Sequence, residues 1–466
     1  MSVSLDLAKE ILDRVLSKGV DHAVVRLEEA YYELISFDNG TLRAYTVTSS
    51  KGVGIKVVIN GVPGYSYSYD LSREAIDKAI ERAVAIARIR KHRKVYSEIA
   101  SKPARGRYSY VSKLDARGVD PEEKVSLVRD ANKAAMELEG VVSSVTRLAF
   151  EHRRKAVVSS FGAEAECTIH LIGLSQLSVA KHGATAERVY DSKSWVGGFE
   201  NVKGFDFPSF AKDVSKLAVE ASKARTPSPG TYRAVIDPEL VGLLIHEAFG
   251  HASEGDLVVT GASVLAGRVG SSVASELVTV VDQGVVEGGY PVPFDDDGNE
   301  KGRTVVVDRG ILRSFLTSPL VAPELGMEVS GNARAQDVSH DTLVRQTNYF
   351  IERGDWSFEE MIRDMKEGLY LKGRGALGGQ VDTTVGTFTF SIGPSYVVKN
   401  GEIAELVRGV TVSGSILETL ANVDAVGRDL EIHTSVFGGC GKGGQMVRVG
   451  DGGPHVRVKK IVVGGA

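Results

Sequence analysis

Two histidines and a glutamate lie within six residues in the segment His246-Glu247-Ala248-Phe249-Gly250-His251. Imidazoles bind divalent cations, and a carboxylate can take a proton from a metal-bound water, so these are the side chains of a metal hydrolase. The spacing is one residue longer than in the common H-E-x-x-H helix, and side chains five apart lie roughly 140° apart around an ideal α-helix. We therefore expect the helix to widen or end between the two histidines, and Gly250 is the residue best suited to that distortion.

The alternative is that His246 and His251 are hydrogen-bonded core histidines and that Glu247 faces solvent. Ionisable side chains on a buried helix are costly unless they are paired or bound to a metal. The motif ends an apolar segment that begins at Asp237-Pro238. Asp is a favoured N-cap and Pro a favoured first helical residue, so this segment is predicted to be a buried helix. A position at the end of such a helix favours the metal site.

A catalytic zinc site has three protein ligands and one open position, so the two histidines need a third partner. The residues just downstream offer Glu254 and Asp256, and the glycine-rich segment 438–445 offers Cys440. A thiolate is a strong zinc ligand, and flanking glycines let it approach an ion closely. The other interpretation of Cys440 is a small buried hydrophobic residue. On residue chemistry alone, the cysteine and the carboxylates are equal candidates.

Other chemically suggestive residues have simpler interpretations. His433 and His455 lie near the cysteine in sequence, but a lone histidine is more often structural. Residues 295–300 (DDDGNE) lack the spaced glutamate of a calcium loop and indicate an acidic turn. The basic run at residues 88–94 is typical of a solvated helix end, which cations stabilise. Cys167 lies in an alternating strand pattern and is expected in the core.

Composition excludes several classes of protein. The 466 residues are 42% hydrophobic and 25% charged with a formal net charge of -4, which is typical of a globular protein and gives no basic surface for nucleic acid. No uncharged apolar stretch reaches 18 residues, so we expect no membrane span. Two cysteines cannot form a disulfide framework, which indicates a reducing compartment, and we expect the protein in the cytoplasm.

The Thr-Pro-Ser-Pro-Gly stretch at 226–230 separates two predicted domains, residues 1–225 and 231–466. In the first, helical patterns flank β-rich runs, and Asn39-Gly40 and Asn60-Gly61 are hairpin signals. The five short runs are HAVVRLEE, YYELISF, LRAYTVT, VGIKVVI and GYSYSY. Helices predicted at 5–18, 72–89, 121–138 and 210–224 suggest a helix–strands–helix unit used twice.

The second domain is predicted to be β-rich. It begins with a strand at 232–236, continues into the motif helix, and then contains mostly strand patterns with turns at Asp308-Arg309-Gly310 and Asn400-Gly401. One further helix is expected after Trp356, with Ser357 and Glu360 as a capping box. The expected fold class is therefore α+β, with an N-terminal helix and antiparallel-sheet domain and a C-terminal curved sheet or barrel around a buried motif helix.

Six segments of the C-terminal half resemble the TldD/PmbA family of metalloproteases, on its TldD side. They are HEAFGHASEGD (246–256), SGNARAQD (330–337), RQTNYFIERGD (345–355), GGQVDTTVGTFTFS (378–391), and CGKGGQ with VGDGGPHVRV (440–445 and 449–458). They stand in the family's order and cover essentially the whole C-terminal domain. The resemblance implies that His246, His251 and Cys440 are the metal ligands and that Glu247 is catalytic. The PmbA-like paralogues lack the H-E-x-x-x-H motif, so the resemblance places this chain as the active subunit.

With these ligands, the expected activity is metal-dependent hydrolysis of unfolded or flexible peptides, with Glu247 as general base. Histidine and cysteine ligands favour Zn²⁺, although iron or cobalt can occupy such a site. The resemblance also implies a dimer, either with a PmbA/TldE-like paralogue or with a second copy, and low sequence preference for the peptide. The competing hypothesis is a non-catalytic peptide-binding or regulatory protein with a structural metal. Three protein ligands argue against it, because structural zinc sites usually have four.

Overall fold

The N-terminal half forms one long, curved sheet of seven strands. The computed structural model describes residues 3–89, 100–376 and 378–465. The elements of this half are α1 (Leu5–Leu16), β1 (His22–Asp38), β2 (Thr41–Ile59), β3 (Val62–Ser68), α2 (Arg73–Ile89), β4 (Arg105–Tyr110), α3 (Pro121–Met136), β5 (Val141–Ser159), β6 (Glu164–His182), β7 (Thr185–Val196), α4 (Phe199–Lys203) and α5 (Phe207–Lys223). The strand order is β3-β2-β1-β5-β6, and β4 and β7 both pair with β6.

A unit of one helix, three antiparallel strands and a second helix occurs twice in this half, as the sequence predicted. The first unit contains β1, β2 and β3 between α1 and α2, and the second contains β5, β6 and β7 between α3 and α5. The units join where β1 pairs antiparallel with β5, from Val24 opposite Ser159 to Asp38 opposite Val145. One continuous sheet therefore spans both units.

The strands are longer than the short runs in the sequence suggested. HAVVRLEE and YYELISF are one strand, β1, and LRAYTVT and VGIKVVI are one strand, β2. The physical reason is that no turn-forming pair separates these runs. Between β1, β2 and β3 the chain reverses at Asn39-Gly40 and Asn60-Gly61, where all four residues have positive φ, as the hairpin signals predicted.

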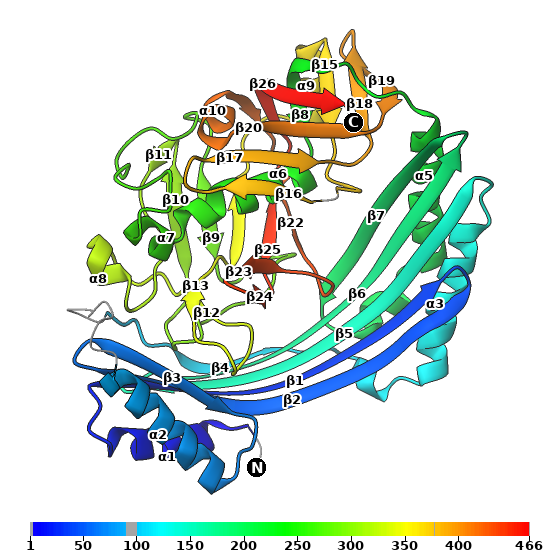
Figure 1. The fold of residues 1–466 in the computed structure, drawn as a ribbon. Helices are drawn as coiled ribbons and strands as arrows, with labels where there is room; N and C mark the ends of the chain where they lie inside the picture. Colours follow the sequence, from blue (N-terminus) through cyan, green and yellow to red (C-terminus); the bar gives the residue numbers. More distant parts are fainter. Residues whose placement is uncertain (1–2, 90–99, 377, 466) are drawn as a thin grey trace.

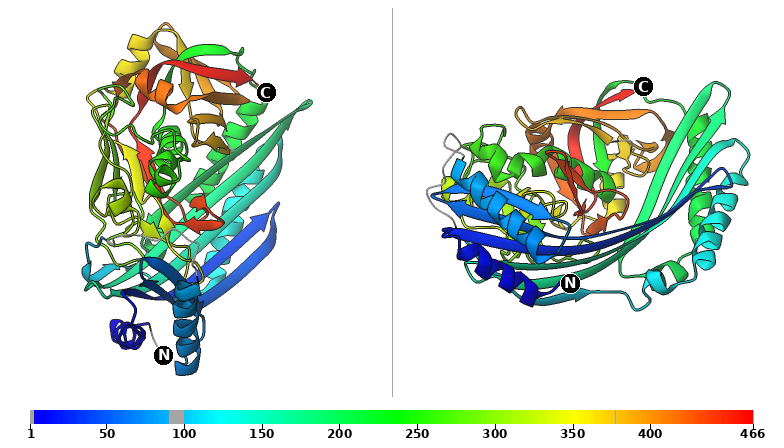
Figure 2. Two further views of the ribbon diagram at one scale, coloured as in Figure 1. Left: turned by 60° about the vertical axis from the view of Figure 1, so that its left-hand side comes forward. Right: turned by 60° about the horizontal axis from the view of Figure 1, so that its bottom comes forward.

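The helices cover the convex face of the sheet, and the C-terminal half lies against its concave face (Figures 1 and 2). Apolar residues of α1 and α2 pack on β1, β2 and one end of β5 in one cluster, and those of α3 and α5 pack on β5, β6, β7 and the far end of β1 in another. A third cluster joins the concave face to the C-terminal half through Tyr290, Val292, Phe294 and Val436. Among the described residues, no helix is both long and apolar enough to cross a membrane.

The C-terminal half contains two larger sheets. Its elements are β8 (Gly230–Ile236), α6 (Pro238–Leu244), α7 (Gly255–Val259), β9 (Val280–Gln283), β10 (Arg303–Asp308), β11 (Ile311–Leu312), α8 (Ala322–Leu325), β12 (Ala333–Arg334), β13 (Leu343–Val344), β14 (Asn348–Ile351), α9 (Phe358–Met365), β15 (Gly368–Leu371), β16 (Gly378–Asp382), β17 (Thr387–Ser391), β18 (Ser395–Lys399), β19 (Glu402–Val407), β20 (Val410–Ser415), α10 (Ile416–Ala421), β21 (Val423–Val426), β22 (Glu431–Thr434), β23 (Cys440–Lys442), β24 (Gln445–Val447), β25 (Gly450–Gly453) and β26 (Val456–Gly465). Nine strands, including β8, β17, β20 and β26, form one sheet, and the order β11-β10-β9-β14-β25-β22 forms the other.

The motif helix α6 lies between these two sheets, at the centre of the largest apolar core (Figure 1). Leu240 and Val241 share this core with Phe390 of the nine-stranded sheet and Tyr349 of the six-stranded sheet. The expected curved sheets around a buried helix are therefore present. The alternative of a barrel is wrong, because neither sheet closes on itself within the described residues. The capping box of Ser357 and Glu360 at α9 is confirmed.

Charged side chains join the two halves. The acidic turn at residues 295–297 faces cations on the concave sheet: Lys56 donates to Asp297 at 3.0 Å, and Asp296 pairs with Arg26 and Lys155. All three carboxylates are buried, so the turn is a contact between the two halves of the chain and not a surface loop. Most of the basic run after α2, residues 90–94, lies outside the described residues.

Candidate metal centre

The motif helix begins as the sequence predicted. Asp237 is the N-cap of α6, and its Oδ1 accepts hydrogen bonds from the backbone N–H of Leu240 at 2.9 Å and of Gly373 at 2.8 Å. Pro238 occupies the first helical turn. The second bond ties the helix start to the loop after β15, so Asp237 both satisfies an N–H of the first helical turn and fixes the helix within the core.

The helix widens across the histidine motif. Residues Ile245–Gly250 form a π-helix, in which the His251 N–H donates to the His246 carbonyl, and Gly250 leads into a short 3₁₀ turn at His251–Ser253. An i→i+5 bond brings residues five apart onto one face, so the extra residue between the histidines no longer separates them. The expectation of a distorted helix is confirmed.

Gly250 is required by packing as well as by the change in helix type. A Cβ on Gly250 would lie 2.1 Å from Oε1 of Gln346. The Gln346 Nε2 donates to the His246 carbonyl at 3.1 Å, so this buried amide packs directly against the widened turn. A larger residue at 250 would displace the side chain that holds the carbonyl of the first histidine.

Cys440 enters the site from a short hairpin. It begins β23, which pairs with β24, and it faces Val447 across the two strands. The turn between the strands is Gly443-Gly444, both with positive φ, which explains two of the glycines around the cysteine. The buried Arg345 donates to the Cys440 carbonyl and, at 3.4 Å, to the Gln445 carbonyl. A guanidinium thus anchors the strand end that carries the thiol.

His246, His251 and Cys440 converge in the folded chain. One ligand atom from each lies within 4.8 Å of the other two, and all three residues are buried. The Cys440 Sγ lies 3.4 Å from the His251 Nε2, and the two imidazole rings are nearly perpendicular at 5.4 Å between centroids. The structure therefore brings together the three ligands implied by the resemblance.

Glu254 and Asp256, the alternative third ligands, lie behind His251. Glu254 Oε2 is 3.1 Å from the His251 Nδ1, on the ring nitrogen that faces away from the thiol. Lys442 donates to Glu254 at 2.8 Å and to Asp256 at 2.7 Å. A carboxylate that accepts from the distal nitrogen fixes the tautomer and ring orientation of a metal-binding histidine, and Glu254 has this position.

Electrostatics favour a thiolate in this cluster. Burial alone would raise the pKa of Cys440, but His246 and His251 outweigh it and lower the pKa to about 5. Burial opposes protonation of His246, yet the Cys440 sulfur raises the pKa of that imidazole to about 9. For Glu254, burial is outweighed by His251 and Lys442, which lower its pKa to about 2. Without a metal, the chain thus stabilises one thiolate beside two protonated imidazoles.

The donors fit a divalent metal ion. Among the described residues, the His246 Nδ1 is buried and has no hydrogen-bond partner, which is costly for a polar atom unless something binds there. Two imidazoles and one thiolate are the kinds of ligand that zinc takes in proteins. Three protein ligands also leave one coordination position for water or substrate.

Glu247 stands at the open side of the cluster. Its side chain is 38% exposed, whereas those of the three other residues are largely enclosed, and its Oε2 lies 3.8 Å from the His251 Nε2. A carboxylate that is both solvent-accessible and next to the ligand atoms can exchange protons with a water in the site.

His433 and His455, the two histidines near Cys440 in the sequence, lie outside the cluster. His433 pairs with Glu431 at 3.4 Å on the exposed part of β22. His455 lies between Asp429, at 2.5 Å, and the Tyr370 hydroxyl, at 3.0 Å. Cys167 is buried in the cluster that joins the sheet to the C-terminal half, as expected for a core residue.

Sequence reasoning from the residues missed Arg345, Gln346 and Lys442. The first two open a run of four polar residues, 345–348, that is fully buried just before and within β14. A polar run directly before an apolar strand segment is the signal that could have pointed to them, since buried polar groups need specific partners. Lys442 carries no such signal, because a lysine in a glycine-rich turn is usually solvated.

Known proteins resemble this chain over its whole length. Models of the PmbA/TldA metallopeptidase family match three parts of the chain: domain 1 at residues 23–87, the central domain at 114–223 and the C-terminal domain at 229–465. A metalloprotease of Methanothermobacter thermautotrophicus is 36% identical over 465 residues, with 100% of both chains covered. A zinc metalloprotease TldD homolog of Saccharolobus solfataricus is 32% identical over 74% of this chain and 76% of its own.

Solved structures show the same fold. TldE from Thermococcus kodakarensis superposes with a TM-score of 0.79 at 18% identity, covering 98% of this chain and 100% of its own. A putative modulator of DNA gyrase from Thermotoga maritima gives a TM-score of 0.79 at 20% identity, covering 98% and 99%. Together with the family models, which match well over half of the sequence, these findings show that the chain belongs to the PmbA/TldD family of metalloproteases.

Proposed function

We propose that this protein is a zinc-dependent peptidase that hydrolyses unfolded or flexible peptides with low sequence preference. The observation that carries the proposal is the convergence of His246, His251 and Cys440 within 4.8 Å, with the accessible Glu247 carboxylate 3.8 Å from a ligand nitrogen. The relative from Saccharolobus solfataricus is named a zinc metalloprotease, which supports zinc, and iron or cobalt are alternatives with the same ligands.

A zinc ion held by these three residues would act as a Lewis acid and lower the pKa of a bound water to about 7. Glu247 accepts a proton from the attacking water at its carboxylate and later delivers that proton to the leaving amine. Glu254 holds His251 in one tautomer through the Nδ1 contact at 3.1 Å. Arg345 keeps Cys440 in place through its backbone carbonyl.

The partner and the compartment are part of the same proposal. The likeness to TldE supports pairing with a TldE-like paralogue, with a second copy of this chain as the alternative. Both cysteines are free thiols that lie in different parts of the fold, which suits the reducing cytoplasm.

The test is Glu247→Gln, assayed for zinc content and for cleavage of an unfolded protein substrate, alone and after mixing with a TldE-like partner. Loss of a general base lowers the rate by about 10²–10⁴-fold, while the three ligands still bind zinc. Glu418→Gln is the matched control, because Glu418 is an exposed carboxylate on α10 in the same half of the chain.

Full cleavage by Glu247→Gln with bound zinc would overturn the assigned mechanism. Zinc binding by the unchanged protein without cleavage of any unfolded substrate, alone or with the partner, would favour the non-catalytic peptide-binding hypothesis instead.

A further inference from the structure

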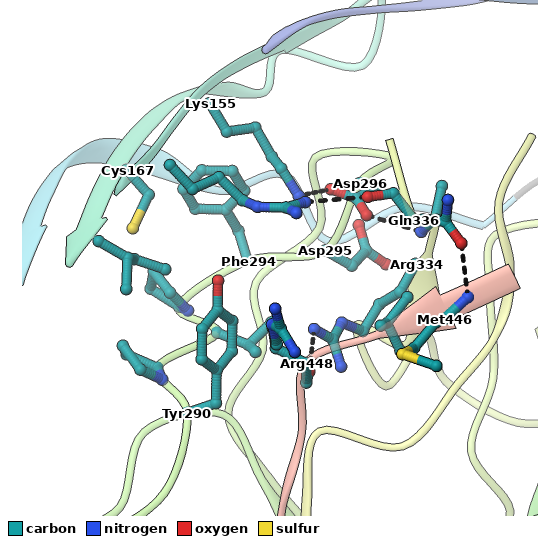
Figure 3. Close-up of a pocket in the computed structure, with 17 residues that line it drawn as sticks. Lys155, Cys167, Tyr290, Phe294, Asp295, Asp296, Arg334, Gln336, Met446 and Arg448 are labelled. Carbon is teal, nitrogen blue, oxygen red and sulfur yellow. Dashed lines mark hydrogen bonds and ion pairs between the residues drawn. The ribbon is translucent and has the colours of Figure 1, made fainter. Parts of the chain in front are cut away.

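A cavity of about 360 Å³ lies where the concave sheet meets the C-terminal half, outside the three-residue cluster (Figure 3). Volumes of about 300–1,000 Å³ are typical of small-ligand sites. We call it the Arg334 pocket. It is lined by Arg153, Lys155, Cys167, Ile169, residues 290–296, residues 334–336 and residues 446–448. The chain thus contains a second site-sized space that the proposed hydrolysis does not use.

Four cations and two carboxylates line this pocket. Lys155 is paired with Asp296, and Arg448 is paired with Glu151 at 2.8 Å. Arg153 pairs with Glu28 at 2.7 Å. Three of the four cations are therefore already neutralised by the chain itself.

Arg334 is the exception. It is 6% exposed, and its guanidinium donates to two backbone carbonyls, of Gln346 at 2.7 Å and of Arg448 at 2.6 Å. Within the part of the chain that the structure describes, no carboxylate forms an ion pair with it. A guanidinium has five N–H donors, so donors remain beyond these two bonds. A buried charge without a counter-ion is costly, and an anionic ligand would offset that cost.

Tyr290 adds a second free donor. Its side chain is buried, and its hydroxyl makes no hydrogen bond to the described residues, although it points into the pocket (Figure 3). Burial raises the pKa of Tyr290, so the hydroxyl stays protonated and can donate. Burial also lowers the pKa of Arg334. Nearby carboxylates raise this pKa but offset the effect of burial only in part, as expected for a cation that lacks an ion-pair partner.

Apolar side chains form another part of the lining, which we call the apolar wall. Ile169, Val292 and Phe294 line the pocket from β6 and from the loop before the acidic turn. Met446, half exposed, lies at the solvent-facing edge. A ligand that fits this arrangement has a carboxylate joined to an apolar body.

The pocket and the metal centre share a hairpin and one residue. Val447 lines the pocket and faces Cys440 across β23 and β24. Gln346 binds Arg334 through its carbonyl and the His246 carbonyl through its side chain. A peptide cleaved at the cluster has carboxylates of the right kind, at its C-terminus and on acidic side chains.

We propose that the Arg334 pocket is a subsite that binds a peptide carboxylate through Arg334 and Tyr290, with the adjoining hydrocarbon against the apolar wall. The subsite rests on the proposed peptidase function for its ligand, but binding to it needs no metal.

The experiment is calorimetric titration of zinc-loaded Glu247→Gln protein with three probes: N-acetyl-leucine, its amide, and the amide of N-acetyl-glutamate. We expect N-acetyl-leucine to bind about 10- to 100-fold more tightly than its amide, since a charge-assisted hydrogen bond contributes that much. If the glutamate probe binds as tightly as N-acetyl-leucine, the subsite accepts acidic side chains. If the glutamate probe binds weakly, the subsite accepts the peptide C-terminus.

Two variants test the pocket without removing the buried Arg334, whose loss could unfold the chain. Tyr290→Phe should weaken N-acetyl-leucine binding several-fold, and Met446→Glu, which adds a carboxylate at the edge, should weaken it at least about 10-fold. Met136→Glu is the matched control, because Met136 is a similarly exposed methionine on α3, and it should change nothing.

Repeating the titration on metal-free His251→Ala protein separates this subsite from the metal centre. Retained binding supports the pocket even if no peptide is ever cleaved. Binding that disappears with the metal, or that ignores both Tyr290→Phe and Met446→Glu, places the carboxylate elsewhere and overturns the proposal.

Discussion

Cys167 and Cys440 are the two cysteines of the chain, and both are buried, with 5% and 1% of their surfaces exposed. Their surroundings differ. Cys167 lies in β6 among apolar residues of the sheet, and burial raises its pKa to about 12 despite the nearby Lys155. Cys440 begins a hairpin beside two histidines. Burial raises the pKa of this thiol too, but the two histidines outweigh burial and lower the pKa to about 5.

The difference shows that burial by itself raises the pKa of a thiol, whereas neighbouring imidazoles lower it and favour the thiolate. A thiolate, and not a thiol, binds zinc. The contact with His246 and His251 thus suits Cys440 to the proposed zinc site, whereas Cys167 packs as a small apolar side chain.

The largest expected effect is the separation of the two thiols in a pH titration of the metal-free protein. Because the pKa of Cys440 is lowered from its usual 9.0, thiolate should form as pH rises through about 5 and be lost below it. Cys167, with its pKa near 12, should stay protonated over the same range. Ultraviolet thiolate absorbance measures both. A midpoint near 5 that persists in Cys440→Ser, or that vanishes in Cys167→Ser, would reverse the comparison.

Metal binding is the next contrast. Cys440→Ser should lower zinc affinity by more than about 100-fold, because even residues that only support a ligand contribute 10- to 100-fold. Cys167→Ser should leave zinc affinity unchanged, since this thiol lies outside the cluster. Competition with a chromophoric chelator measures both affinities. Stoichiometric, tight zinc in Cys440→Ser would show that the third ligand lies elsewhere, with Glu254 and Asp256 as the first candidates.

The histidine half of the cluster followed from the sequence because its geometry is local. The spacing of His246 and His251 required a widened helix, and the Asp237-Pro238 cap fixed where that helix begins. The α+β class and the repeated helix–strands–helix unit were likewise carried by local periodicity and by Asn-Gly turns. Strand lengths were not, because a β-pattern continues through a run of mixed polarity when no turn residue stops it.

The cysteine half did not follow from local pattern. Cys440 lies 189 residues from His251, and residue chemistry left it equal to Glu254 and Asp256 until the family resemblance was considered. Its anchor, Arg345, binds a backbone carbonyl, and such a contact imposes no spacing that a sequence displays. The Arg334 pocket was missed for the same reason, since its donors come from segments that meet only in the fold.

The smallest predicted effect compares two carboxylates near the cluster: Glu254, which contacts His251, and Asp256, which contacts Lys442 and not His251. Glu254→Gln should weaken zinc binding by about 10- to 100-fold, because a neutral amide no longer favours the His251 tautomer that presents Nε2 to the metal. Asp256→Asn should weaken zinc binding much less, because Asp256 accepts a hydrogen bond from Lys442 and does not contact the histidine. Chelator competition gives both values, and the thiol titration of the same variants shows whether Cys440 responds. Equal losses of zinc affinity in Asp256→Asn and Glu254→Gln would contradict this. They would indicate that Lys442, which contacts both carboxylates and lies in the same strand as Cys440, is the supporting group.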